Sequence, residues 1–193
     1  MRRLAGLAGV AALAAVGAVA APRTAAAADS THGPFYVQGS PVGAAVGLYP
    51  GSSITVGNFT YSVGGSLGFY RLDAEFGYHF FGRGDGLVAG IRQVFLLGWG
   101  SAGITSGRIG WDVAVPIGEE MELGIGPYAH LGALYPFNGN SAAFFFGFGV
   151  DVKLYFAQKL GLYAFVRPIE FSLMTTDPLV PFLSFAGGVG WSF

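Results

Sequence analysis

The stretch FFFGFGVDVKLYF, from Phe144 to Phe156, decides how this chain folds. Every second residue from Phe144 onward is large and apolar, and the residues between them are mostly small, polar or charged, including Gly149, Asp151 and Lys153. A period of two residues is that of a β-strand, because successive side chains of a strand point to opposite faces. The stretch therefore predicts a strand with one wholly apolar face and one small or polar face.

The same alternation recurs along the rest of the chain, in segments separated by Gly, Pro, Asn and Asp. These segments are 42–49, 70–80, 87–99, 108–117, 121–135, 160–167 and 183–193. Short turns at 82–86, 118–120 and 157–159 alternate with less regular links at 50–66, 101–105, 138–141 and 175–181. We therefore expect an all-β domain of eight strands in an up-and-down antiparallel meander, with turns at one end and loops at the other. The first strand is expected to begin at about residue 35 or 42.

Composition excludes several classes of protein. Of the 193 residues, 33 are glycine, 52 % are hydrophobic and 11 % are charged, and the mean hydropathy is +0.53. The charged fraction is less than half of the ~25 % usual in soluble domains, which argues against an ordinary water-soluble globule. No cysteine is present and the basic residues do not cluster, so thiolate metal sites are excluded and nucleic acid is not expected as a partner. No spacing predicts a metal ion or a cofactor.

The N-terminal segment has the three parts of a secretory signal. Met1-Arg2-Arg3 is followed by an apolar run to Ala21 and then by small residues. We expect residues 1–28 to be a cleavable signal peptide and residues 29–193 to form the barrel. A membrane anchor is the competing interpretation, but the run is mostly alanine and glycine. Cleavage would lower Lys+Arg from 10 to 7 against 11 Asp+Glu, a net charge of −4.

The volume of an eight-stranded barrel decides which face points inward. A soluble barrel would place the apolar face inside, but that interior is barely wide enough for side chains, and this face carries most of the large apolar residues. The opposite face is rich in glycine and suits a crowded interior. With the apolar face outward in lipid, closure pairs every backbone group. Aromatic residues expected at the two membrane interfaces are Tyr78, Phe80, Phe156, Trp191 and Phe193 at the turn end, and Trp99 and Tyr135 at the loop end.

These features resemble the small outer-membrane β-barrels of Gram-negative bacteria, of the OmpA transmembrane-domain and OmpX type. The resemblance rests on the leader, the eight alternating strands and a last strand that ends in alternating Val189, Trp191 and Phe193. It implies an eight-stranded transmembrane barrel in the outer membrane, surrounded by lipid. It also implies that Phe193 and Trp191 form the signal read by the barrel-assembly machinery. We expect a monomer.

On this register most charges of the mature chain point into the lumen. They are Arg71, Asp73, Glu75, Arg92, Arg108, Asp112, Glu122, Asp151, Lys153 and Arg167, with Glu170 joining them if Pro168 marks a bulge. Buried charges of both signs at this density predict an ion-pair network. The network is expected to fill the lumen and to give the protein a structural or interaction role. A narrow pore or a small-ligand-binding barrel is the alternative function.

An enzymatic role, such as lipid hydrolysis or acyl transfer, is not expected. Of the three histidines, His130 lies on the inward face, but no catalytic motif surrounds it. Asp73 and Glu75 share a face and could serve as paired carboxylates, but Arg71 beside them favours an ion pair. We therefore assign no catalytic residue.

Overall fold

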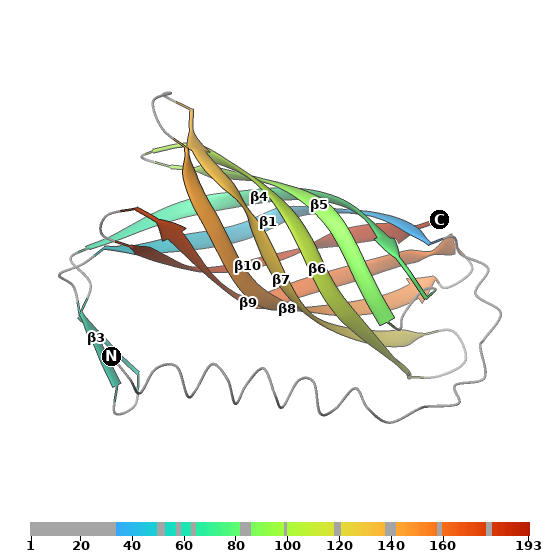
Figure 1. The fold of residues 1–193 in the computed structure, drawn as a ribbon. Helices are drawn as coiled ribbons and strands as arrows, with labels where there is room; N and C mark the ends of the chain where they lie inside the picture. The colour runs from blue at the N-terminus through green and yellow to red at the C-terminus, as the bar shows by residue number, and fades with distance from the viewer. Residues whose placement is uncertain are drawn as a thin grey trace. The chain divides into compact units, whose positions relative to one another are not determined.

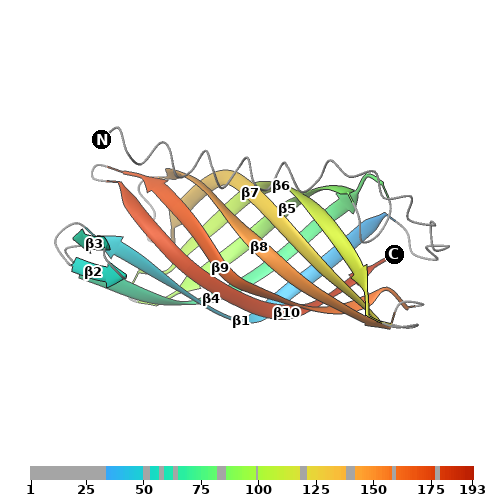
Figure 2. The same ribbon diagram turned by 90° about the horizontal axis from the view of Figure 1, so that it is seen from below.

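The strands form because alternating residues give each segment one face for the lumen and one for the outside. The computed structural model describes residues 34–49, 53–56, 59–62, 65–81, 86–98, 100–117, 121–137, 142–157, 160–176 and 179–193. Eight strands close into an antiparallel barrel in which β1 pairs with β10 (Figures 1 and 2). They are β1 (Phe35–Tyr49), β4 (Gly65–His79), β5 (Gly86–Leu97), β6 (Ala102–Pro116), β7 (Glu122–Pro136), β8 (Ala143–Ala157), β9 (Leu162–Thr175) and β10 (Val180–Ser192). The predicted fold class is confirmed.

Some strand boundaries differ from the predicted ones. The first strand begins at Phe35, the earlier of its two expected starts, whereas β4 and β6 begin inside segments that were expected to be links. The link predicted at 50–66 also contains a separate two-stranded sheet, β2 (Ser53–Val56) with β3 (Phe59–Ser62). At the starts of β4 and β6 the alternation is weak because small residues follow one another there, Gly65-Ser66 and Ala102-Gly103. Within the described parts of the chain, no helix is long and apolar enough to cross a membrane.

The signal predicted at residues 1–28 lies outside the described residues. So do Trp99 and most of the predicted short turns, at 82–85, 118–120 and 158–159.

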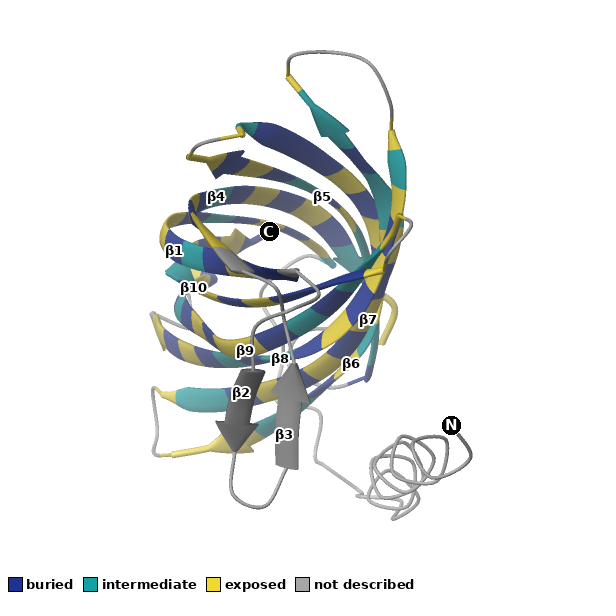
Figure 3. Ribbon diagram, turned by 90° about the vertical axis from the view of Figure 1, so that its left-hand side faces the viewer, coloured by how far each residue is buried: buried dark blue, intermediate teal, exposed yellow. Residues whose placement is uncertain are grey.

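The predicted facing of the strands is confirmed. Along each strand, buried and exposed residues alternate (Figure 3). Ile91, Phe148 and Val189 are 66 %, 60 % and 62 % exposed on the outer surface, whereas the charged residues between such positions are buried inside. The outer surface is therefore apolar and the lumen holds the charges.

Bulges in β1 and in β9 interrupt the alternation. In β1 the register shifts between Gly39 and Val42, and Pro41 and Val42 both face outward. In β9 the extra residue falls at Pro168 and Ile169, which are both exposed. A bulge reverses the facing of every residue beyond it.

The consequence in β9 is that Arg167 and Glu170 are both buried in the lumen. The condition on which the inward position of Glu170 depended, a bulge at Pro168, is therefore met in the structure.

Candidate functional site: the interior of the barrel

Among the described residues, the interior contains ten buried charged side chains, five basic and five acidic. They are Arg71, Arg92, Arg108, Lys153 and Arg167 with Asp73, Glu75, Asp112, Asp151 and Glu170. Their formal charges sum to zero, as burial in a medium of low dielectric constant requires. Glu122, the eleventh residue predicted for this set, is only partly buried, at the first residue of β7 near the turn end.

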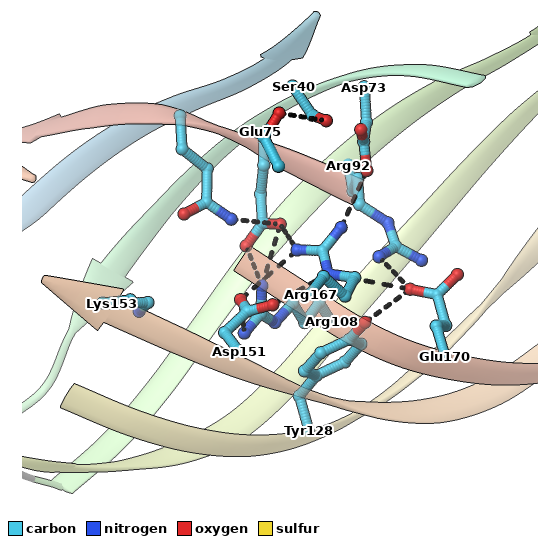
Figure 4. A network of polar contacts seen from close by, with 12 residues as sticks. Ser40, Asp73, Glu75, Arg92, Arg108, Tyr128, Asp151, Lys153, Arg167 and Glu170 are labelled. Atoms are coloured by element: carbon cyan, nitrogen blue, oxygen red, sulfur yellow. Dashed lines mark hydrogen bonds and ion pairs between the residues drawn. The ribbon is translucent and has the colours of Figure 1, made fainter. Parts of the chain in front are cut away.

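Arg167 of β9 is the centre of the network (Figure 4). Its Nε lies 2.8 Å from Oδ1 of Asp151, and its Nη1 lies 2.7 Å from Oδ2 of Asp73. Its Nη2 lies 3.5 Å from Oε2 of Glu75. The three carboxylates come from β8 and β4, so one guanidinium joins strands on different sides of the lumen.

Glu170, the residue just beyond the β9 bulge, accepts hydrogen bonds from several donors on the loop side of Arg167. Nη1 of Arg71 lies 2.8 Å from one carboxylate oxygen, and Nη1 of Arg92 lies 2.6 Å from the other. The Tyr128 hydroxyl donates to the oxygen shared with Arg92. The bulge thus gives Arg92 a carboxylate, and it gives Arg71 a second one beside Asp73.

Arg108 and Tyr128 complete the middle of the network. Arg108 lies 3.0 Å from Glu75 and 2.7 Å from Asp151. Its guanidinium carbon lies 3.9 Å from the centre of the Tyr128 ring, a cation–π distance. The hydroxyl of Tyr36 donates to Glu75 at 2.5 Å, and the side-chain amide of Gln38 donates to it at 3.0 Å. Glu75 is therefore held from several strands at once.

Toward the turn end the interior becomes aromatic. Lys153 pairs with Asp112 at 2.5 Å, and its Nζ lies 5.5 Å and 5.8 Å from the ring centres of Tyr36 and Tyr163. His79 is buried beside Tyr36, with a ring-centre separation of 5.0 Å. This layer lies between the network and the end of the barrel where both described termini lie.

Toward the loop end the interior is apolar, which the alternation of residues did not predict. A cluster of buried residues fills it, consisting of Ala45, Phe69, Val94, Leu96, Ala102, Ile104, Leu134, Phe145, Val180 and Phe182, with Met174 packed against them. We call this cluster the apolar layer. A void of about the size of a water molecule lies between it and Arg71, Arg92 and Glu170. The lumen therefore has three filled layers.

The histidine considered for catalysis does not form a proton relay. The Ser172 hydroxyl lies 3.2 Å from Nε2 of His130, and the nearest Glu170 oxygen lies 3.9 Å from the same nitrogen. In a serine–histidine–acid triad, the acid binds the other ring nitrogen. Both Ser172 and His130 are also buried. Among the described residues, no group of three potential metal-binding side chains is present.

Comparison with known proteins agrees with this geometry. No protein-family model matches the chain, and no curated protein sequence matches it. Among solved structures it is similar to Neisserial surface protein A, with a TM-score of 0.51 and 15 % sequence identity, over 82 % of this chain and 97 % of that one. The fold is that of a small outer-membrane barrel.

A second solved structure, Ail, the attachment invasion locus protein of Yersinia pestis, matches with a TM-score of 0.33 and 11 % identity. That match covers 83 % of this chain and 99 % of that one. At 15 % identity, the similarity to Neisserial surface protein A shows the fold alone.

Sequence reasoning missed the uncharged members of this interior. Tyr36, Gln38, Tyr128 and Tyr163 all bond to network residues. A signal for them exists, because they occupy the same alternating face as the charges. Tyr128 alternates with outward-facing residues on β7, and Tyr163 does so on β9. The prediction missed these residues because it considered only the charged residues on that face.

Proposed function

We propose that this chain is an integral outer-membrane protein with a closed lumen, whose role is structural or interaction-based. One observation carries the proposal, namely that the outer surface is apolar while the lumen is filled along its length. A surface with Ile91, Phe148 and Val189 more than half exposed would be costly in water and is suited to lipid. The ion-pair network and the apolar layer, with a void of only about water size between them, support a closed lumen.

The proposal includes export by the segment 1–28, insertion in the outer membrane and a monomeric state. Trp191 and Phe193 are 47 % and 43 % exposed on the outer surface at the end of β10, where a partner could contact them. This exposure supports recognition of the last strand by the barrel-assembly machinery. The longest connection at the loop end, which carries β2 and β3, is the segment on which an interaction role would depend.

Membrane insertion is tested by expression in a Gram-negative host. We expect the protein in the carbonate-resistant fraction of the outer membrane, with heat-modifiable mobility on gels. Recovery from the soluble periplasm would overturn the proposal.

The closed lumen is tested by reconstitution in planar bilayers. We expect no discrete conductance steps from the wild-type protein, because both the network and the apolar layer block the lumen. The charged column from Arg92 to Lys153 is the observation that favours a narrow pore instead. Conductance steps that disappear when Arg92 or Arg108 is neutralised would establish the pore and overturn the closed lumen.

We also propose that the chain is not an enzyme. The supporting observation is that Ser172 and Glu170 approach the same nitrogen of a buried His130. Lipid modification by the purified protein that is lost in His130→Ala would contradict this.

A further inference from the structure

A hydrogen-bonded polar cluster interrupts the apolar outer surface near the loop end. It consists of Gln93 of β5, Thr105 of β6 and Tyr135 of β7, which are neighbouring strands. Gln93 and Thr105 are cross-strand partners. The ring of Tyr135 crosses β6 over its own partner Gly103, where an added Cβ atom would overlap it. Gly103 thus allows the Tyr135 hydroxyl to reach Gln93.

The three side chains use their hydrogen-bond donors on one another and on the backbone. Nε2 of Gln93 donates to the Tyr135 hydroxyl at 2.8 Å and to the Val94 carbonyl at 3.2 Å. The Thr105 hydroxyl donates to Oε1 of Gln93 at 2.5 Å, so the 3.3 Å contact between the Tyr135 and Thr105 hydroxyls is donated by Tyr135. Within the described structure each of the three oxygens accepts one bond, although each has two lone pairs. The cluster can therefore accept further hydrogen bonds but has no free donor.

The surroundings of the cluster are apolar on both sides. Ile91 is exposed toward the turn end, and Phe95 and Phe137 are exposed toward the loop end. The ring centre of Phe137 lies 6.4 Å from that of Phe95 and 6.3 Å from that of Tyr135. The cluster itself is uncharged, so it offers no counter-charge to a phosphate or an ammonium group. Polar side chains that face hydrocarbon are costly, which makes such a cluster a candidate binding site.

The lengths of the strands indicate how deep the cluster lies in a membrane. β6 and β7 have 15 residues each, which corresponds to roughly 38 Å of depth for a tilted strand. The apolar band of such barrels is only ~25 Å tall, so the strands project beyond it. Gln93 lies four residues before the end of β5, roughly 10 Å inside the loop end. The cluster therefore lies at about the edge of the band, where acyl chains join their headgroup.

We propose that Gln93, Thr105 and Tyr135 bind a lipid that carries hydrogen-bond donors next to its acyl chains, namely amide N–H or hydroxyl groups. These donors bond to the vacant lone pairs of the three oxygens. Ester-linked phospholipids do not meet this need, because their carbonyls at the same depth only accept. The inference rests on the proposed insertion in a bilayer and specifies which lipid this part of the outer surface selects.

Sphingomyelin and phosphatidylcholine are matched probes for this site. They share one headgroup, but sphingomyelin has an amide N–H and a hydroxyl where phosphatidylcholine has ester carbonyls. The folded protein is mixed with equal amounts of both lipids in a detergent without hydroxyl groups, and native mass spectrometry measures the one-to-one complexes. We expect sphingomyelin to be enriched about three- to tenfold, as for one net hydrogen bond.

Variants assign the enrichment to the cluster. Gln93→Leu/Thr105→Val replaces two polar side chains by apolar ones that suit lipid, and should lower the ratio of the two lipids to about one. Tyr135→Phe removes a single oxygen and should lower the ratio partly, which provides a second variant if the first fails to fold. Thr175→Val is the matched control, because Thr175 is an exposed threonine at the loop end of β9. It should retain the wild-type ratio.

Three outcomes would overturn the proposal. The first is equal retention of both lipids by the wild-type protein. The second is unchanged enrichment in both cluster variants, which would place the lipid elsewhere. The third is a protein dimer that the cluster variants lose, which would mean that the cluster binds a second copy of the chain. Heat-modifiable mobility is scored on the same samples, so any of these results in a folded protein leaves membrane insertion standing.

Discussion

Tyrosine rings lie flat against glycines on the inner wall, and these contacts set how tightly the lumen packs. A Cβ atom added at Gly77 would overlap the ring of Tyr36, and one added at Gly190 would overlap that of Tyr163. Glycine is required at these positions for space, since neither has a positive φ.

Gly77→Ala is expected to destabilise the barrel by about 1–3 kcal/mol, because the Tyr36 ring must move and strain its bond to Glu75. Urea unfolding in detergent micelles, followed by the gel mobility of the folded form, measures this. Gly68→Ala is the matched control in the same strand, since a Cβ there meets nothing within 4 Å. Equal stability of the two variants would show that the ring adapts freely.

The pair Lys153–Asp112 lies apart from the arginines and can be tested by a double-mutant cycle. Removal of one partner leaves the other buried and unpaired, so Lys153→Met should cost about 3–5 kcal/mol. Asp112→Asn should also destabilise the barrel. The double variant should lose less free energy of unfolding than the two single variants lose together. The difference, measured by urea unfolding, should be about 0.5–3 kcal/mol. Additive losses would mean that the pair contributes nothing.

At the scale of the strand, alternation predicted most of the fold and of the site. It placed ten of the eleven named charges in the buried interior, because charge and glycine share a face that the large apolar residues avoid. Where both faces carry apolar residues, as with Val94 inside and Phe95 outside, hydrophobicity cannot distinguish them. The apolar layer was missed for this reason.

Other features of the fold depend on contacts that no single strand contains. The sequence could not reveal the β2–β3 sheet, whose strands are four residues each. It also could not reveal which carboxylate each arginine contacts, because that depends on the register around the closed barrel. The β1 bulge at Pro41 broke the alternation, which left the start of the first strand open between two positions.

The β9 bulge can be tested by changing its length. Deletion of Pro168 removes the extra residue, so either Glu170 or Arg167 must turn outward into lipid. We expect the deletion variant to lack the heat-modifiable folded band. Pro168→Ala keeps the residue count and should fold. If the deletion variant unfolds at the same urea concentration as the wild type does, the strand accommodates the lost residue elsewhere.

At the scale of the whole molecule, the apolar outer surface should respond to charge according to its depth in the membrane. Ile91, near the middle of β5, is 66 % exposed, and Phe81, after the end of β4, is 72 % exposed. Ile91→Arg should destabilise the protein in lipid vesicles by about 2–4 kcal/mol and Phe81→Arg by at most about 1 kcal/mol. Equilibrium unfolding from vesicles measures both. Equal effects would argue against a bilayer around this surface.

The ion pairs join residues that are distant along the chain, and this constrains how the barrel can fold. Arg71 and Glu170 are 99 residues apart, and Arg167 and Asp73 are 94 apart. Neither pair can form before β9 and β4 share one lumen. A partly closed sheet would expose unpaired charges to hydrocarbon, so intermediates are penalised and closure is cooperative. Dependence on such non-local contacts predicts slow folding, completed in a single late step when β1 meets β10.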